Sequence, residues 1–287
     1  MKEQVVQFGP KRNLVGILAQ PSGSDAGLEA PAVIMLNAGL LHRIGPHRMS
    51  VLLARRLATA GVCSLRFDMG NFGDSTELPS GKSEDERVLS DVQSAMDFLE
   101  QKEIAHSFVL AGLCSGADNS YSVALREPRV TGTIFLDGHG FWTSWSRVVH
   151  YLPRLLRVRS WFNFARRNLS QGTPSKEGQD AMLGQQRLRR PFGERLEVER
   201  ALQSLVDRGT QMLYIYTGSV KYYYNYANQF FDMFKGLDPR GRIKVVYFPK
   251  ADHTYTFTED RDLMFAALIK WYVSRPWVGS QKEIATK

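Results

Sequence analysis

Apolar runs of strand length alternate with segments of helical periodicity along most of the chain. Continuous apolar runs are typical of strands that are buried on both faces, and apolar residues spaced three and four apart are typical of helices with one buried face. Their alternation predicts an α/β fold, with a mostly parallel sheet and helices on both faces. The predicted strands cover residues 5–8, 14–19, 32–36, 62–67, 107–111, 130–136, 211–216 and 243–248. The predicted helices cover residues 49–60, 83–102, 116–126, 196–208, 226–234 and 261–274.

The alternation stops between Gly140 and about Pro191, where the sequence becomes aromatic and rich in arginine. It resumes afterwards with helix and strand patterns of the earlier kind. We therefore expect one α/β core formed by residues 1–139 and 197–287. A basic, aromatic-rich and helical cap, residues 140–196, would be inserted into it.

Charge and composition argue against a nucleic-acid-binding protein and against a membrane-spanning one. The 287 residues carry a formal charge of +8, and the segment Arg147–Arg200, with twelve basic and five acidic side chains, accounts for +7 of it. No nucleic-acid-binding motif accompanies these cations, so a nucleic-acid partner is not expected. No apolar run is long enough to cross a bilayer, and no secretory signal is apparent at the N-terminus, so we expect a cytoplasmic protein without stable membrane insertion.

The segment Gly112-Leu113-Cys114-Ser115-Gly116 carries the strongest chemical signal. It joins a predicted buried strand to a predicted helix and has the pattern G-x-nucleophile-x-G, which holds a reactive side chain on a sharp turn. The start of a helix is electropositive, so Cys114 should hold more of its sulfur as thiolate than a free cysteine does. The other cysteine, Cys63, falls within the predicted strand 62–67 and is interpreted as core.

Of the six histidines, His253 has the placement that a catalytic base needs. It follows the last predicted strand, and loops after parallel strands gather at the sheet edge where Cys114 is expected. His106 precedes a strand and should lie at the opposite edge. His42 and His47 could line the pocket or cap a helix. With no acid cluster evident near them, neither a metal site nor a cofactor is expected.

The carboxylate that would orient His253 is less evident. The loop after the predicted strand 211–216 is a usual place for it, but residues 217–222 contain no acid, and the nearest candidates are Asp232 and Asp238. Asp137, at the end of strand 130–136, would lie at the catalytic edge, although Asp-Gly is also a common turn. Both interpretations of Asp137 stay open, and Asp252 is a weaker candidate because side chains adjacent in a loop usually diverge.

Two segments are predicted to form an oxyanion hole, a pair of donors for the negative charge that develops on a substrate oxygen. The backbone N–H of Ser115 would supply one donor. The small residues of Asn37-Ala38-Gly39 allow close approach of backbone, so Gly39 or Leu40 would supply the second.

From Leu14 to Ser274 the chain resembles the α/β-hydrolase superfamily. The landmarks are the small-residue loop at 37–39, the elbow at Cys114, the late His253, and residues 68–75, which match a D-x-x-G-x-G-x-S loop except at Asn71. Residues 42–75 are similar to hydrolases associated with bacterial exosortase and exopolysaccharide systems. Those usually carry serine at the elbow, whereas Cys114 is similar to the nucleophile of dienelactone hydrolases.

The resemblance and the thiol together imply acyl transfer through Cys114. A thiol exchanges with a thioester at little cost in free energy, so the leading hypothesis is a thioesterase or acyltransferase. The basic cap would attract an anionic donor such as a coenzyme A thioester or an acyl carrier protein. The alternatives are an ester or lactone hydrolase, and a non-catalytic binding protein on a hydrolase scaffold.

Overall fold

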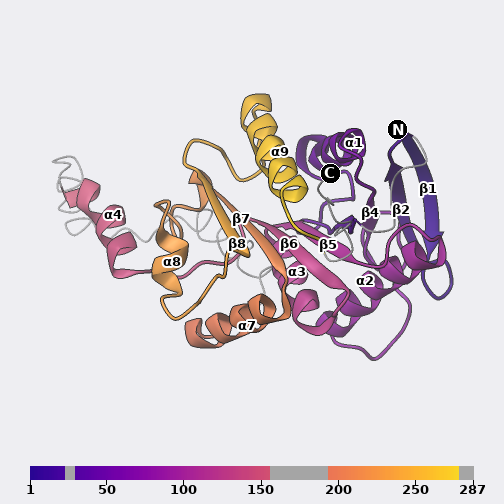
Figure 1. Ribbon diagram of the computed structural model, residues 1–287, viewed down its shortest axis with the longest axis horizontal. Helices are drawn as coiled ribbons and strands as arrows, with labels where there is room; N and C mark the ends of the chain where they lie inside the picture. Colours follow the sequence, from indigo (N-terminus) through magenta and orange to yellow (C-terminus); the bar gives the residue numbers. More distant parts are fainter. Residues whose placement is uncertain (23–29, 156–192, 278–287) are drawn as a thin grey trace, which may run out of the picture.

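The computed structural model describes residues 1–22, 30–155 and 193–277. An eight-stranded sheet with the order β1-β2-β4-β3-β5-β6-β7-β8 lies at its centre (Figure 1). β1 and β4 both run antiparallel to β2, and all other neighbours in the sheet are parallel. The strands are β1 (Lys2–Phe8), β2 (Leu14–Gln20), β3 (Ala32–Met35), β4 (Ser64–Asp68), β5 (Phe108–Leu113), β6 (Val130–Leu136), β7 (Gln211–Thr217) and β8 (Ile243–Phe248).

Helices cover both faces of this sheet, which confirms the predicted α/β architecture. Helices α1 and α9 lie on one face, and α2, α3 and α7 lie on the other (Figure 1). Each face has its own apolar core, because the central strands are buried on both sides. The helices are α1 (Met49–Thr59), α2 (Glu84–Gln101), α3 (Ser115–Arg126), α4 (Ser144–Leu155), α7 (Arg195–Arg208), α8 (Gln229–Met233) and α9 (Thr258–Val273), with short 3₁₀ turns η1 (Pro46–Arg48) and η2 (Gly218–Val220).

Element boundaries follow local capping chemistry. The helix predicted over 83–102 is α2, and Ser83 and Lys102 cap its two ends. Ser83 and Glu86 form a reciprocal capping box that satisfies free N–H groups of the first turn.

Two details of the predicted elements are wrong. Cys63 lies just before β4 rather than within a strand, although it packs against the core and burial raises the pKa of its thiol. The helix predicted over 226–234 shortens to α8, a single turn and a little more.

The predicted cap falls largely outside the described residues. Helix α4 belongs to it, and residues 156–192 are not described. The limits of the cap therefore stay a prediction. Within the described ranges, no helix has the length and apolar character needed to cross a membrane.

Candidate active site

Cys114 occupies the turn between β5 and α3 in a conformation that non-glycine residues rarely adopt. Its backbone angles are φ 56° and ψ −118°, outside the common allowed regions. Its N–H donates to the carbonyl of Leu136 at 2.9 Å, and its carbonyl accepts from the N–H groups of Ala117 and Asp118 in the first turn of α3. Strain of this kind persists only where the surroundings hold it, and it clusters at functional sites.

The two glycines of the elbow are required by close backbone contacts. A Cβ atom on Gly112 would lie 2.1 Å from the carbonyl carbon and oxygen of Gly116. A Cβ atom on Gly116 would lie 2.6 Å from the carbonyl oxygen of Asn37, two residues after β3. The glycine pattern therefore lets α3 start directly against the segment that follows β3.

His253 and Asp137 form a close pair beside Cys114. Nδ1 of His253 lies 2.7 Å from Oδ2 of Asp137, and the imidazole also makes a hydrogen bond with the Cys114 side chain. Since Nδ1 faces Asp137, Nε2 is left for the thiol. Burial alone would lower the pKa of His253, but the hydrogen bonds with Asp137 and Cys114 outweigh it and raise the pKa to about 9.

Register in the sheet explains how Asp137 reaches this position. Leu136 is paired with Leu113 of β5 on one side and with Ile215 of β7 on the other, so Asp137 follows at the same edge as Cys114. The Asp137 carboxylate is fully buried and accepts two hydrogen bonds from Thr217, one from its N–H to Oδ1 and one from its hydroxyl to Oδ2, each 2.7 Å long. The carbonyl of Asp137 accepts from the Tyr223 hydroxyl at 3.1 Å.

Thr217 and Tyr223 are supporting residues that the sequence reasoning missed. Thr217 is the last residue of β7, next to the loop that is a usual place for the orienting carboxylate. A buried hydroxyl at that position was the available signal, because a buried carboxylate needs donors.

The other candidate acids make different contacts. Asp252 is turned into its own loop, where it accepts hydrogen bonds from Thr254 and Thr256. Asp232 accepts from the Tyr226 hydroxyl at 2.6 Å, and Asp238 is bonded to Arg240.

The predicted oxyanion segments meet each other through an unexpected contact. The N–H of Gly39 donates to Oγ of Ser115 at 2.7 Å, so the loop after β3 is tied to the first residue of α3. Leu40, the other candidate, has 76% of its surface exposed. The site thus brings Gly39 and Ser115 together, while the Leu40 side chain faces solvent.

A buried carboxylate holds the loop that carries Gly39. Asp68, at the end of β4, is fully buried and accepts from the Asn37 side chain at 3.1 Å and from the Arg43 backbone at 2.6 Å. The Arg43 guanidinium contacts both Asp68 and Asp74, and its hydrogen bond to Asp74, together with one from His42, lowers the pKa of Asp74.

The expectation that no acids lie near His42 is therefore wrong. Among the residues that the structure describes, His42, Asp68 and Asp74 bring ligand-type atoms within 4.8 Å of one another. Arg43 forms ion pairs with both of these carboxylates, so the four side chains form an ion-pair cluster at this edge of the sheet.

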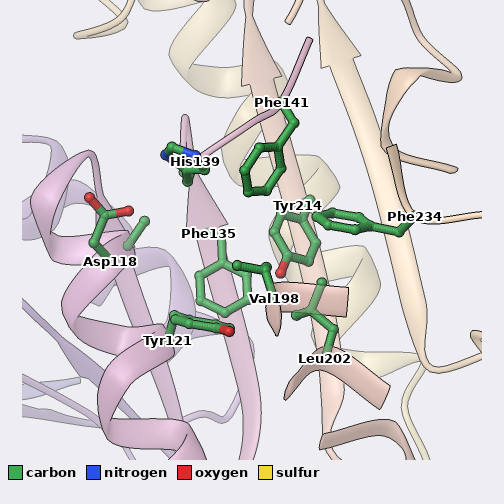
Figure 2. A pocket seen from close by; sticks show the side chains of 11 residues that line it. Asp118, Tyr121, Phe135, His139, Phe141, Val198, Leu202, Tyr214 and Phe234 are labelled. Atoms are coloured by element: carbon green, nitrogen blue, oxygen red, sulfur yellow. The ribbon is translucent and has the colours of Figure 1, made fainter. Parts of the chain in front are cut away.

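A small cavity adjoins the catalytic edge on the side of α3 and α7. Figure 2 shows Asp118 and His139 near one end of it, with the rings of Phe135, Phe141 and Tyr214 along its wall. Its volume of about 20 Å³ holds about one water molecule. In this conformation the cavity has no room for an acyl chain.

Comparison with known proteins gives matches by structure alone. No family model and no curated protein matches the chain. An esterase from Pyrococcus furiosus matches with a TM-score of 0.59 and 14% identity, over 97% of this chain and 92% of that one. An α/β hydrolase from a Penicillium species also matches with a TM-score of 0.59 and 14% identity, over 95% and 98% of the two chains. An α/β serine hydrolase without a lid from Xanthomonas campestris matches with a TM-score of 0.54 and 14% identity, over 94% of each chain.

These matches and the sheet order show that the chain has the α/β-hydrolase fold. At such identities they show the fold alone. The finer resemblances to exosortase-associated and dienelactone hydrolases stay predictions.

Proposed function

We propose that this protein is a hydrolase that cleaves carboxylic esters through an acyl-enzyme on Cys114. The observation that carries the proposal is the contact of His253 with both Asp137 and Cys114, at a turn whose strained backbone presents the thiol. The esterases among the proteins of similar fold support ester hydrolysis over other chemistries of this scaffold.

Each residue of the proposed triad has one task. The Cys114 sulfur, as thiolate, forms a bond with the carbonyl carbon, and the electron pair of the carbonyl moves onto oxygen. When the carbonyl reforms, the bond to the alcohol breaks and His253 Nε2 gives its proton to the leaving oxygen. Water then attacks the acyl-enzyme and loses a proton to His253, so that carboxylic acid and free Cys114 are released. Asp137 keeps the imidazole oriented throughout.

The sulfur nucleophile favours a second candidate, a thioesterase or an acyltransferase. Transfer of an acyl group from a thioester to Cys114 exchanges one thioester for another, so the step is nearly balanced in free energy. The segment Arg147–Arg200, with +7 of the total charge of +8, would favour an anionic donor, such as a coenzyme A thioester or an acyl carrier protein. In this version an alcohol or amine could replace water as acceptor.

Matched substrates separate the two candidates. Oxygen esters and thioesters that carry the same acyl chain are offered to the protein, and turnover and intact mass are followed. We expect an acyl increment on Cys114 that is lost in Cys114→Ala and retained in Cys63→Ala, the matched control on the other cysteine. A kcat/KM that is higher for thioesters would select the second candidate.

The same panel tests the base. His253→Ala should remove most turnover and slow alkylation of Cys114 at neutral pH. If wild-type protein gives no adduct and no turnover with any substrate of the panel, the protein is a binding module and the proposal is wrong.

A further inference from the structure

The contact between Gly39 and Ser115 engages one of the two proposed oxyanion donors. Oγ of Ser115 accepts the Gly39 N–H at 2.7 Å. It therefore occupies the position in which a substrate oxygen would accept that N–H. Gly39 therefore cannot donate directly to substrate while this contact persists.

The Ser115 hydroxyl has hydrogen-bonding capacity left at this point. Its oxygen accepts one hydrogen bond from Gly39, and a hydroxyl also carries a proton that it can donate. Within residues 1–22, 30–155 and 193–277, Gly39 is the sole hydrogen-bond partner that the structure gives to this hydroxyl. Its proton is thus available to an acceptor that binds at the elbow.

The backbone holds this hydroxyl close to the reacting atoms. Ser115 is bonded to Cys114 in the chain and is the first residue of α3. The loop with Gly39 is held two residues earlier, because the Asn37 side chain donates to Asp68 and accepts from the Met69 N–H. One side of the contact is therefore the first residue of α3, and the other is a turn held through Asn37.

We infer that the side-chain hydroxyl of Ser115 is a catalytic donor to the substrate carbonyl oxygen. Its oxygen is held by the Gly39 N–H, and its proton points to the oxyanion, beside the backbone N–H of the same residue. A donor whose own oxygen accepts a hydrogen bond is polarised and donates more strongly. This role deepens the proposed function, rests on it, and gives Ser115 two donors where the sequence suggested one.

Removal of the hydroxyl tests the inference. Ser115→Ala should lower kcat about 100-fold with little change in KM, since loss of one oxyanion donor has an effect of about 10²–10³ in kcat. Ser115→Thr keeps a hydroxyl and should restore most of the rate. Ser122→Ala, two turns further along α3, is the matched control and should behave as wild type. Circular dichroism of each variant verifies the fold.

A second measurement separates an effect of the substitution on oxyanion binding from an effect on the reactivity of the thiol. An aldehyde inhibitor adds to Cys114 and leaves an oxygen at the oxyanion position, whereas alkylation by iodoacetamide places none there. We expect Ser115→Ala to weaken the aldehyde at least 10-fold and to leave the alkylation rate unchanged.

Two results would overturn the inference in different ways. If Ser115→Ala is as active as wild type or more active, the hydroxyl merely fills an empty oxyanion hole, and the proposed function still stands. If wild-type protein shows neither turnover nor aldehyde binding, the proposed function fails and the role of Ser115 fails with it.

Discussion

Thr217 donates both its backbone N–H and its hydroxyl to the carboxylate of Asp137, one to each oxygen. The two residues come from the ends of the neighbouring strands β6 and β7. Oδ2 also faces Nδ1 of His253, so this pair of hydrogen bonds sets the direction in which the carboxylate meets the imidazole.

Thr217→Val should lower both the stability of the protein and its rate of turnover. The variant leaves Oδ2 of a buried carboxylate with one donor fewer, and a hydrogen bond to a charged group contributes about 1.5–3 kcal/mol. Urea unfolding should show a loss of that size, and kcat should fall because the Asp137 carboxylate is less well oriented.

Thr133→Val is the matched control. Thr133 lies on β6, and its buried hydroxyl has no hydrogen-bond partner among the described residues. Its removal should leave the free energy of unfolding unchanged or raise it. Equal losses in both variants would show that the Thr217 hydroxyl has no special role.

The acylation rate should decline as pH rises through about 9. His253 with a pKa raised to about 9 is an imidazolium at neutral pH, and this proton is the one given to the leaving group. Above that pH the proton is lost while the thiolate remains. Stopped-flow acylation should therefore fall on the alkaline side, whereas alkylation of Cys114 by iodoacetamide should not.

Asp137→Asn should shift the decline of the acylation rate to lower pH. The variant removes the negative charge that favours the imidazolium, so the pH at which the rate declines should fall by about one to three units. Turnover should fall clearly, yet less than in Cys114→Ala, because a thiol needs less help from a base than a hydroxyl does. If Asp137→Asn leaves the rate and its pH dependence unchanged, the catalytic unit is a Cys-His dyad.

A methyl group on either elbow glycine should disrupt the site. Gly116→Ala brings a Cβ within 2.6 Å of the Asn37 carbonyl, and overpacking of this kind costs about 1–3 kcal/mol or more. Thermal unfolding should show a reduced Tm together with a loss of turnover. Gly81→Ala, where a Cβ meets no atom of the described residues within 4 Å, should change neither Tm nor turnover and serves as control.

Asp68→Asn should weaken the loop that carries Gly39. The change leaves the Arg43 guanidinium without its buried partner, and breaking such a pair costs about 3–5 kcal/mol. Asp74→Asn removes the exposed partner of the same guanidinium and should alter Tm little. A comparable drop in both variants would contradict the assignment of Asp68 as the anchor.

The fold and the elbow could be predicted from the sequence because their signals are local. Buried strands read as continuous apolar runs, as in β5 and β6. The glycines around Cys114 mark a turn that has no space for side chains, and His253 follows a strand that ends at the same edge. The roles proposed for these residues stay predictions.

What the sequence could not provide are contacts between distant segments. The bonds of Thr217 to Asp137 span 80 residues, and that of Gly39 to Ser115 spans 76. The acids around His42 were missed for the same reason, since Asp68 comes from a different strand. Such pairs depend on strand order and register, which no local pattern contains.

The hydrogen bonds between Asp137 and Thr217 place the ends of β6 and β7 side by side, next to the imidazole of His253. We expect that a carboxylate at position 217, with a hydroxyl at position 137, would keep a charge and a donor near the same imidazole. On this expectation, moving the acid from one strand to the other needs neither a new loop nor a displaced histidine. In such a fold, the catalytic acid would move from the end of β6 to the end of β7 by two substitutions, while the elbow at Cys114 stays unchanged.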